Sequence, residues 1–411
     1  MRTADGTPLK VSLARALRRQ KLRAFLLIAP LLGFILFSFL FPIGSMLFRS
    51  VENNIVGDTL PKTVVALRDW DPATGSLPDE KVFAAFHADM VQAFEDKTHT
   101  KVGLRLNYDE PGMSGLFRKT GSKAKRMEAP YAEAFKAVDE SWAKIDTWKV
   151  IKRLSPRVTD SYFLASVDLK RTARGDIERV PENERLYIFL FERTLFLSLV
   201  ITGTCLILGF PIAYLLAHLP MRISNMLLIL ILLPFWTSLL VRTSAWKVLL
   251  QQQGVVNDIL VWIGLVADDS RLQMMNNQFA TIVAMTHILM PFMILPLYSV
   301  MQTISPTYVR AAKSLGATDW TAFWRVYFPQ TIPGIGAGAI LVFILAIGYY
   351  ITPELVGGTS GVFISNRIAY HISASLNWGL AAALGSILLI MVVLLFYVYD
   401  KLVGIDNVKL G

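Results

Sequence analysis

The chain has 411 residues, of which 54% are hydrophobic and only 18% charged, with a mean hydropathy of +0.46. This composition excludes an ordinary soluble globular protein and indicates a polytopic membrane protein. The net charge of +10 can suggest a nucleic-acid partner. We expect none, because part of the excess lies in 1–23, where seven Lys and Arg residues face one acid, Asp5. A basic tail before a first span favours a cytoplasmic N-terminus.

Six segments are long and apolar enough to cross a membrane as helices. The first is predicted to be a retained span rather than a signal peptide, because its apolar run of about 25 residues exceeds a signal sequence core. The only cysteine, Cys205, lies inside a predicted span, so no intramolecular disulfide can form. The predicted spans are 24–48, 194–217, 225–241, 279–300, 334–352 and 379–399.

Alternation from a cytoplasmic N-terminus gives the expected organisation. It comprises a basic cytoplasmic tail (1–23), a first span (24–48), an extracytoplasmic insert (49–193), a core with five spans (194–400) and a cytoplasmic tail (401–411). The core contains a cytoplasmic loop at 305–333. In the insert, apolar spacing predicts helices at 81–97 and 128–154 and strands at 102–106 and 162–169. The insert is therefore expected to be a mixed domain, acting either as a solvated cap or as a docking platform for a soluble partner.

The sequence carries no motif of an enzyme or of a self-powered transporter. There is no G-x-x-x-x-G-K-[ST] loop, and the glycine-rich GGTSG at 357–361 contains no lysine. Neither H-E-x-x-H nor G-x-S-x-G is present. The predicted spans contain no carboxylate, and His287 is their only imidazole, whereas ion-coupled carriers often place such groups in the membrane. Any ATPase is expected to be a separate chain, and no metal site is expected.

The cytoplasmic loop at 305–333 predicts two short helices around a glycine. Pro306 suits a first helical turn, and Gly316 suits the left-handed position after a helix end. Thr318 or Asp319 can cap the second helix. That helix is expected to end at Pro329 and Pro333 and to carry one aromatic stripe: Trp320, Phe323, Trp324 and Tyr327. The hairpin is read as a surface for a cytoplasmic protein, with an interfacial helix on lipid headgroups as the alternative.

The stretch RAAKSLGATDWTAFWRVYFPQTIPG at 310–334 resembles the EAA loop of permease subunits of bacterial ABC importers. The resemblance rests on Ala311, Ala312, Gly316, Pro329 and Pro333. It departs at Arg310, where the family usually has glutamate. The resemblance implies a type I importer permease fold, with this loop seated in a cleft of the ATP-hydrolysing subunit. The implied coupling residues are Arg310, Ala311, Ala312, Gly316, Trp320, Phe323, Trp324 and Pro329.

Other stretches are similar to the spermidine/putrescine-type branch of that family: GFPIAY (209–214), LPFWTSLLVRTSAW (233–246), GVVN (254–257) and TPELVGG (352–358). The resemblance implies a non-enzymatic permease in the bacterial inner membrane, with both termini cytoplasmic. Its implied partners are ABC ATPase subunits, a second permease subunit, a periplasmic solute-binding protein and the lipid bilayer. It implies no cofactor on this chain, with ATP and Mg²⁺ bound by the ATPase. The insert is longer than the usual first outside loop, so nothing about it carries over.

The candidate solute path combines aromatic faces, which attract cations, with a carboxylate that can pair with an amine. The residues are Trp236, Thr237, Tyr349, Tyr350 and Glu354, and Arg242 nearby suits an anionic solute better. The alternative is that these aromatic residues form an interfacial belt. The alternative functions are import of another small solute, ion-coupled secondary transport and a membrane-anchored receptor.

Overall fold

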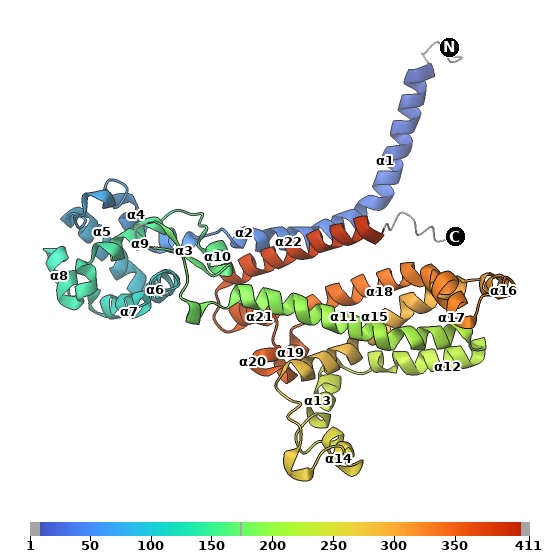
Figure 1. Ribbon diagram of the computed structural model, residues 1–411. Coiled ribbons are helices and arrows are strands. Elements are labelled where there is room, and N and C mark those ends of the chain that lie inside the picture. The colour runs from blue at the N-terminus through green and yellow to red at the C-terminus, as the bar shows by residue number, and fades with distance from the viewer. Residues whose placement is uncertain (1–8, 173–174, 404–411) are drawn as a thin grey trace.

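The computed structural model describes residues 9–172 and 175–403, so parts of the two predicted tails, 1–8 and 404–411, lie outside the described residues. The described chain is elongated and almost wholly helical (Figure 1). A body of short helices lies at one end, a bundle of long helices lies in the middle, and the hairpin of α16 (Pro306–Ser314) and α17 (Asp319–Ala322) lies at the other end. The predicted all-α polytopic fold is confirmed.

The short helices belong to the predicted insert. The only strands in the described residues are β1 and β2, which pair antiparallel with Leu169 opposite Arg179. The elements of the insert are α3 (Asn54–Thr59), α4 (Pro61–Ala66), η2 (Pro72–Thr74), α5 (Glu80–Glu95), α6 (His99–Asn107), α7 (Met113–Ala124), α8 (Tyr131–Val138), η3 (Glu140–Ala143), α9 (Ile145–Arg153), α10 (Ser161–Ser166), β1 (Leu169–Arg171), β2 (Ile177–Arg179) and η4 (Glu182–Glu184).

The strand predicted at 102–106 is wrong, because this segment lies within α6. The alternation of Val102, Leu104 and Leu106 suggested a period of two, but Val102 and Leu106 are fully buried while Leu104 is 42% exposed. Positions i and i+4 therefore face the core, as they do on a helix. The strand predicted at 162–169 is also mostly helix, since α10 covers 161–166 and only Leu169 enters β1.

The core of the insert is a cluster of aromatic rings contributed by α5, α7, α8, η3 and α9. At its centre is Phe86, whose ring centroid lies 4.7 Å from that of Trp142 and 5.3 Å from that of Trp148. Both tryptophan N–H groups are satisfied: Trp142 donates to Thr120 Oγ1 at 2.9 Å and Trp148 to the Trp142 carbonyl at 3.1 Å. Large rings with paired N–H groups give this small domain a dense core without a disulfide.

The remaining elements form the membrane part. Among the described residues, five helices are long and apolar enough to span a membrane, and a bent pair can supply a sixth span. The elements are α1 (Leu9–Ile35), the π-helical turn η1 (Leu36–Leu40), α2 (Phe41–Arg49), α11 (Tyr187–His218), α12 (Met221–Leu232), η5 (Leu233–Trp236), α13 (Leu239–Leu249), α14 (Val255–Trp262), η6 (Asp268–Ser270), α15 (Gln278–Thr303), α16, α17, the π-helical turn η7 (Phe323–Tyr327), α18 (Phe328–Gly348), α19 (Ile351–Val356), α20 (Gly358–Gly361), α21 (Ile364–Ser373) and α22 (Trp378–Val403).

Two predicted boundaries are corrected by the structure. The predicted span 225–241 is not one straight helix, because α12 with η5 and α13 are bent by 95° after Trp236. The hairpin's second helix does not end at Pro329 and Pro333. Instead α17, η7 and α18 form one apolar helix from Asp319 to Gly348. Pro329 lies two residues after the wider π-helical turn η7, and this local widening is where the continuous helix accommodates a residue without an N–H.

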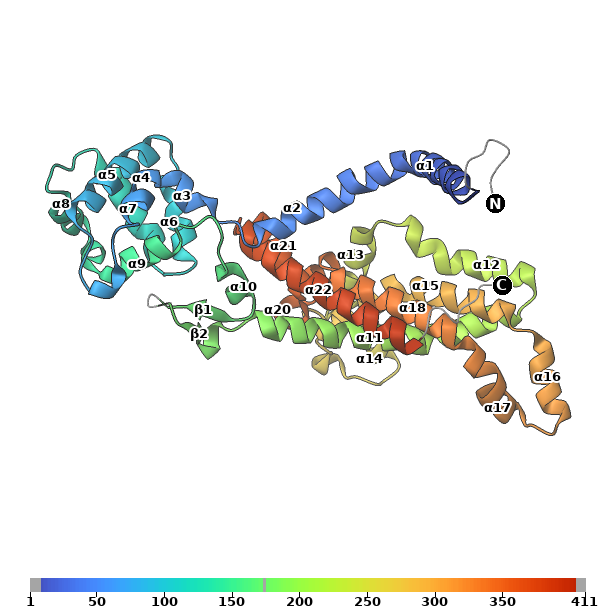
Figure 2. The same cartoon turned by 90° about the horizontal axis from the view of Figure 1, so that it is seen from above.

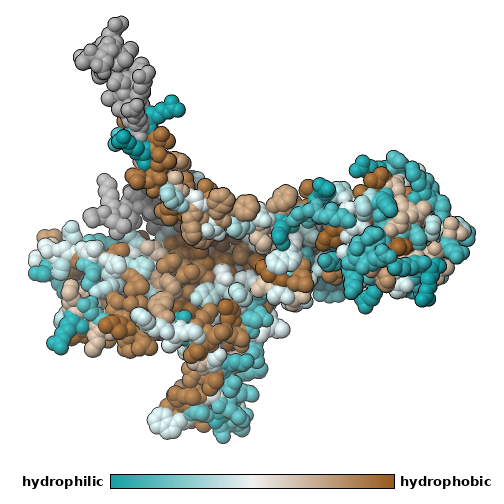
Figure 3. All heavy atoms as spheres, turned by 180° about the vertical axis from the view of Figure 1, so that it is seen from behind, coloured by the Kyte–Doolittle hydropathy of each residue, from teal (hydrophilic) through white to brown (hydrophobic). Residues whose placement is uncertain are grey.

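The centre of the bundle is formed by α11, α15 and α18, which pack along one another (Figures 1 and 2). Their buried cluster includes Leu197, Ile201, Met293, Val342 and Ala346. By contrast, no residue in the most apolar stretch of α1 and α2 is buried. Apolar surface gathers over the bundle, while the insert is covered by hydrophilic residues (Figure 3). This division is typical of a lipid-embedded bundle with a solvated domain.

The insert is anchored to the last span through Tyr162. A Cβ on Gly379 of α22 would lie 2.3 Å from the Tyr162 ring, so only glycine permits this approach. The Arg105 guanidinium carbon lies 4.7 Å from the centre of the same ring, and Arg105 Nη1 is 2.6 Å from Asp109 Oδ2. Arg105 Nε also donates to Asn53 Oδ1 at 2.8 Å. The insert therefore docks on α22 through a buried, hydrogen-bonded cation and an aromatic ring.

A second contact at this junction centres on His371 of α21. One ring nitrogen lies 2.9 Å from the Tyr187 hydroxyl, and the other lies 2.8 Å from Ser375 Oγ. Burial, with a smaller contribution from Arg367, lowers the pKa of His371 to about 4. The imidazole is therefore neutral at neutral pH and links α11 to the end of α21 by hydrogen bonds.

Gly379→Val is expected to destabilise this junction by about 1–3 kcal/mol, because the new side chain overpacks the Tyr162 ring. The thermal melting temperature of the purified full chain is the measurement. Gly385→Val is the matched control on the same helix, since its Cβ would meet nothing within 4 Å. Adding Tyr162→Ala to Gly379→Val should recover part of the loss. Equal melting temperatures for Gly379→Val and Gly385→Val would contradict this role of the glycine.

Candidate functional site

The α16–α17 hairpin protrudes from the end of the bundle (Figure 2). At its start Ser305 is the N-cap of α16, and its hydroxyl accepts a hydrogen bond from the Thr307 N–H at 3.4 Å. Pro306 occupies the first turn, where its missing N–H has no helical partner to lose. The predicted start of this helix is confirmed.

The turn between the two helices depends on Gly316, which has a φ of +90°. The Gly316 N–H donates to the Lys313 carbonyl at 2.9 Å, and the Ala317 N–H donates to the Ala312 carbonyl at 3.0 Å. These are the two bonds of a Schellman motif, which closes a helix on a residue of positive φ. The predicted left-handed glycine is confirmed, and it fixes the angle at which the chain reverses.

The second helix is capped by Thr318, one of the two residues predicted for this role. Its hydroxyl accepts a hydrogen bond from the Thr321 N–H at 3.3 Å. Asp319 instead forms an ion pair with Lys313 across the turn. The pair is exposed, so it contributes little to stability, but it joins the two arms of the hairpin.

The four aromatic residues of the second arm do not form one stripe. Phe323 and Tyr327 face the bundle, with ring centroids 5.8 and 5.3 Å from that of Tyr214 on α11. Trp320 and Trp324 face outward, 5.6 Å apart, and Trp320 is 72% exposed. The helix thus attaches to the bundle by one pair of rings and offers the other pair at the surface.

Of the remaining predicted coupling residues, three lie on α16, and Pro329 lies in the first turn of α18. Arg310, Ala311 and Pro329 are exposed, and Ala312 is half-buried. Leu315, at the tip beside Gly316, is 90% exposed, and the sequence analysis did not single it out. Its signal in the sequence was its position directly before the turn glycine.

The predicted solute path begins at the bend between α12 and α13. Trp236 is 90% exposed, and Thr237 Oγ1 donates to the Pro234 carbonyl at 2.8 Å. Ser238 caps α13, accepting a hydrogen bond from the Val241 N–H at 3.2 Å. The bend therefore satisfies part of its own backbone, which a break inside a membrane span requires.

Arg242 lies one turn into α13 and faces the bundle. Its Nε is buried without a hydrogen-bond partner among the described residues. Its positive charge lies close enough to interact electrostatically with both the His287 ring and the Tyr349 hydroxyl. The helix is tied to α19 next to this point, where the Thr243 and Thr352 hydroxyls are 3.1 Å apart. The structure thus brings Arg242 and Tyr349 together with His287, which was not among the residues predicted for the solute path.

Glu354 and Tyr350 meet at the side chain of Asn366. The Asn366 Nδ2 donates to Glu354 Oε2 at 2.6 Å and to the Tyr350 carbonyl at 2.8 Å. Ser365 Oγ donates to the Tyr349 carbonyl at 2.6 Å. Sequence reasoning missed both Ser365 and Asn366. Their signal was a polar pair opening a helix directly after the apolar 362–364 segment. The Glu354 side chain remains exposed, so its other oxygen is free to accept a further donor.

The glycine-rich stretch at 357–361 is a packing element. A Cβ on Gly357 or Gly361 would lie 2.5 Å from Thr281 Oγ1, and one on Gly358 would lie 2.5 Å from the Asn276 carbonyl oxygen. The glycines therefore let α19 and α20 approach the start of α15. No space for a phosphate is left against their Cα atoms.

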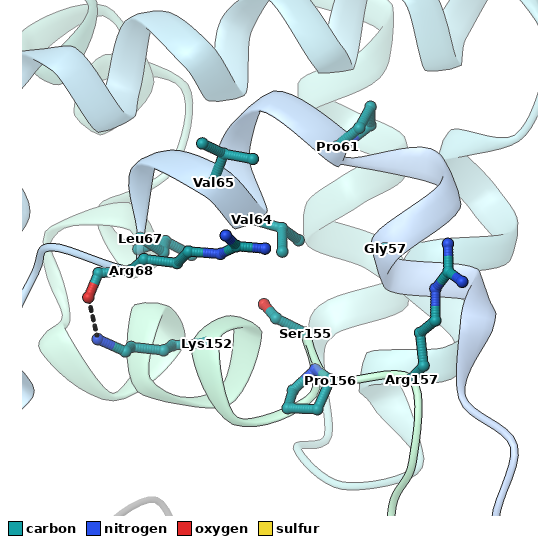
Figure 4. Close-up of a pocket in the computed structure, with 10 residues that line it drawn as sticks. All are labelled: Gly57, Pro61, Val64, Val65, Leu67, Arg68, Lys152, Ser155, Pro156 and Arg157. Carbon is teal, nitrogen blue, oxygen red and sulfur yellow. Dashed lines mark hydrogen bonds between the residues drawn. The ribbon is translucent and has the colours of Figure 1, made fainter.

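The insert contains a cavity of about 560 Å³ between α4 and the end of α9 (Figure 4). Lys152 is committed to the protein, because its Nζ donates to the Arg68 carbonyl at 3.3 Å and also to the Trp70 carbonyl. No residue predicted for coupling or for the solute path lines this cavity. Its lining is Gly57, Pro61, Val64, Val65, Leu67, Arg68, Lys152, Ser155, Pro156 and Arg157.

Comparison with known proteins places this architecture in a family. Residues 209–403 match the family described as "Binding-protein-dependent transport system inner membrane component". The chain is 35% identical over 226 residues to the spermidine/putrescine transport system permease protein PotB of Salmonella typhimurium (strain SL1344), covering 55% of this chain and 78% of PotB. Identity to PotB of Escherichia coli (strain K12) is 35% over 224 residues, covering 54% of this chain and 81% of that protein.

The inner membrane ABC transporter permease protein YdcU of Escherichia coli (strain K12) is 32% identical over 224 residues, covering 52% of this chain and 71% of YdcU. The family match begins inside α11 and leaves out the insert. These relatives are transport subunits rather than enzymes. The chain therefore belongs to the binding-protein-dependent transport system inner membrane component family, as a multi-pass inner membrane permease subunit of the ABC importer branch that includes PotB.

Proposed function

We propose that this permease imports a polyamine-type solute, such as spermidine or putrescine, as one half of a transmembrane pathway completed by a second permease subunit. Two ABC ATPase subunits bind ATP and Mg²⁺ and drive it, and a periplasmic solute-binding protein delivers the solute. The names of the PotB relatives support the solute class. This chain binds no cofactor of its own in the proposal.

The observation that carries the proposal is the geometry of the hairpin. A Schellman turn and the Thr318 cap hold its two arms in one arrangement, while Leu315 and Trp320 project outward. A rigid exposed apolar tip is suited to a cleft in another protein, because little conformational entropy is lost on docking. We assign the ATPase to this tip and its coupling role to Gly316, Trp320 and Trp324.

The orientation follows from this assignment. The hairpin and the insert lie at opposite ends of the bundle (Figure 1), so a cytoplasmic hairpin requires an extracytoplasmic insert. The proposed division is a cytoplasmic tail (1–23), a first span (24–48), the insert (49–193), the permease core (194–400) with its coupling loop (305–333), and a cytoplasmic tail (401–411). Both termini are then cytoplasmic.

Transport by alternating access uses the continuity between hairpin and bundle. Closure of the ATPase dimer on ATP displaces the hairpin. Because α17, η7 and α18 are one helix, that displacement passes directly into the core span. The Phe323 and Tyr327 rings transmit it to Tyr214 on α11. The two spans then rock together and open the path outward to receive the solute.

The proposal is tested by co-expressing the tagged chain with the ABC ATPase encoded in a neighbouring gene and purifying the tagged chain. We expect the ATPase to co-purify with the chain. We also expect proteoliposomes that contain all subunits and ATP to take up labelled spermidine. Leu315→Asp, at the exposed tip, should abolish co-isolation without removing the chain from the membrane. Uptake by this chain alone on an ion gradient would replace the importer proposal with secondary transport.

The solute class is tested at Glu354. Glu354→Gln is expected to raise the KM for polyamine uptake by roughly tenfold, because a charge-assisted hydrogen bond to an ammonium group is lost. The glutamine keeps the size of the side chain and can still accept from Asn366. Glu354→Asp, which keeps the charge, is the control. An unchanged KM in Glu354→Gln, together with competition by carboxylates rather than amines, would assign the path to an anionic solute through Arg242.

A further inference from the structure

A cavity of about 540 Å³ lies between the hairpin and the ends of two spans. It is bounded by the last turn of α11, the end of α15 and the inner side of α16 and η7. It is separate from the exposed tip assigned to the ATPase, since neither Leu315 nor Trp320 lines it. The residues that matter for its chemistry are Tyr214, His218, Arg310, Lys313, Asp319 and Tyr327.

The wall of this cavity carries more positive than negative charge. Arg310 and Lys313 line it, and the one acid in its lining, Asp319, is already paired with Lys313. The Arg310 side chain has no hydrogen bond or ion pair with any residue in 9–172 or 175–403. The cavity therefore offers, at its exposed rim, a guanidinium without a partner among the described residues, the group that best matches a phosphate or carboxylate.

A buried hydroxyl at the cavity also lacks a hydrogen-bond partner in the part of the chain that the structure describes. Tyr327 is only 4% exposed, and its hydroxyl has no hydrogen-bond partner within the described chain. A buried hydroxyl without a partner is unfavourable, and each such group needs an explanation. A ligand rich in acceptor oxygens supplies one.

The position of the cavity identifies the source of those oxygens. His218 ends α11, and Met301 and Gln302 lie in the last turn of α15, both of which are membrane-spanning helices. The cavity thus lies at the depth where the hydrocarbon ends and lipid headgroups begin. Its wall combines aromatic rings, Tyr214 and Phe323, with cations, the combination that lipid headgroup sites show at membrane surfaces.

We propose that this cavity binds the phosphate of an anionic phospholipid headgroup, with Arg310 and Lys313 as its cationic ligands. The bound headgroup bridges the hairpin to the ends of α11 and α15 and holds the inner side of the hairpin against the bundle. Arg310, the one departure from the EAA pattern, then serves lipid rather than the ATPase. This binding is independent of which solute the permease carries.

The test uses the full chain in nanodiscs of phosphatidylcholine, with or without phosphatidylglycerol. Native mass spectrometry after mild delipidation should find phosphatidylglycerol retained, and the melting temperature should be higher in discs that contain it. Arg310→Gln and Lys313→Gln are each expected to weaken that retention about fivefold, as expected for the loss of one cation near anionic headgroups. Arg310→Lys should retain most of the binding.

Arg325→Gln is the matched control, because Arg325 is an exposed cation of the same hairpin that does not line the cavity. Equal losses in Arg310→Gln and Arg325→Gln would overturn the proposal in favour of a nonspecific effect of surface charge. Retention of phosphatidylcholine and phosphatidylglycerol to the same extent would overturn it as well. Displacement of the lipid by millimolar inorganic phosphate would assign the site to free phosphate instead.

Discussion

Replacing Gly316 with valine is expected to reduce ATP-driven uptake roughly a hundredfold while leaving the chain in the membrane, since strain at a positive φ costs up to about 3 kcal/mol for a branched residue. The observed φ of +90° is open to glycine but not to valine. The turn must therefore rearrange, which moves Leu315 away from its present position. Uptake by reconstituted transporter, normalised to the amount of inserted protein, is the measurement.

Gly316→Asn separates backbone strain from steric exclusion. Asparagine enters positive φ more readily than other non-glycine residues, and a Cβ at this position would meet nothing within 4 Å in this chain. Substantial activity in Gly316→Asn together with loss in Gly316→Val would assign the effect to the turn. Loss in both variants would show that the ATPase cleft excludes any side chain here. Full activity of Gly316→Val would remove the turn from the coupling mechanism.

Phe86→Ala is expected to destabilise the insert by about 3–5 kcal/mol, the cost of emptying a buried phenyl site. Phe86 is fully buried and contacts the rings of Phe117, Phe135, Trp142 and Trp148. This loss is comparable with the total stability of many small domains. Limited proteolysis of the full chain in detergent should therefore cut the insert much faster, while the membrane bundle stays intact.

Val65→Ala is the control for this change, because Val65 belongs to the same domain but is 58% exposed. It should leave the rate of cleavage within twofold, as expected of surface substitutions, which typically change stability by less than about 0.5 kcal/mol. Cleavage of the membrane bundle at the same rate as the insert in Phe86→Ala would show that the two parts do not unfold separately. Unchanged cleavage would mean that the aromatic cluster does not limit the stability of the insert.

The sequence predicted the hairpin well because its signals are local. Pro306, Gly316 and Thr318 each act through backbone geometry within a few residues, and the structure has all three in their predicted roles. The aromatic residues after them were harder to interpret. Trp320 and Trp324 form one i,i+4 pair and Phe323 and Tyr327 another, and only the second pair contacts Tyr214 on α11. Which pair faces the bundle depends on that tertiary contact, which the helical period alone does not reveal.

The solute path was predictable only as a set of residue types. Tyr349 and Glu354 were identified from their place near span ends, but Asn366 and His287 become part of the site only through tertiary contacts. The bend after Trp236 was hidden for a related reason. Pro234 is tolerated within membrane helices, so the apolar run of 225–241 gave no sign that the helix turns by 95°. Short alternating segments such as 102–106 remain ambiguous until their burial is known.

The long first span has a consequence for how the protein fits its membrane. The helix Gln20–Arg49 has 30 residues, and at 1.5 Å per residue it is about 45 Å long, against a hydrocarbon layer of about 30 Å. It must therefore tilt or bend to match the bilayer, and the π-helical turn at Leu36–Leu40 lies in its middle. Its apolar stretch is not buried, and α2 contacts the bundle along α22, so a change in its tilt reaches the last span before the central helices α11, α15 and α18. A thicker or thinner bilayer will change the tilt of this helix before it disturbs the transport core.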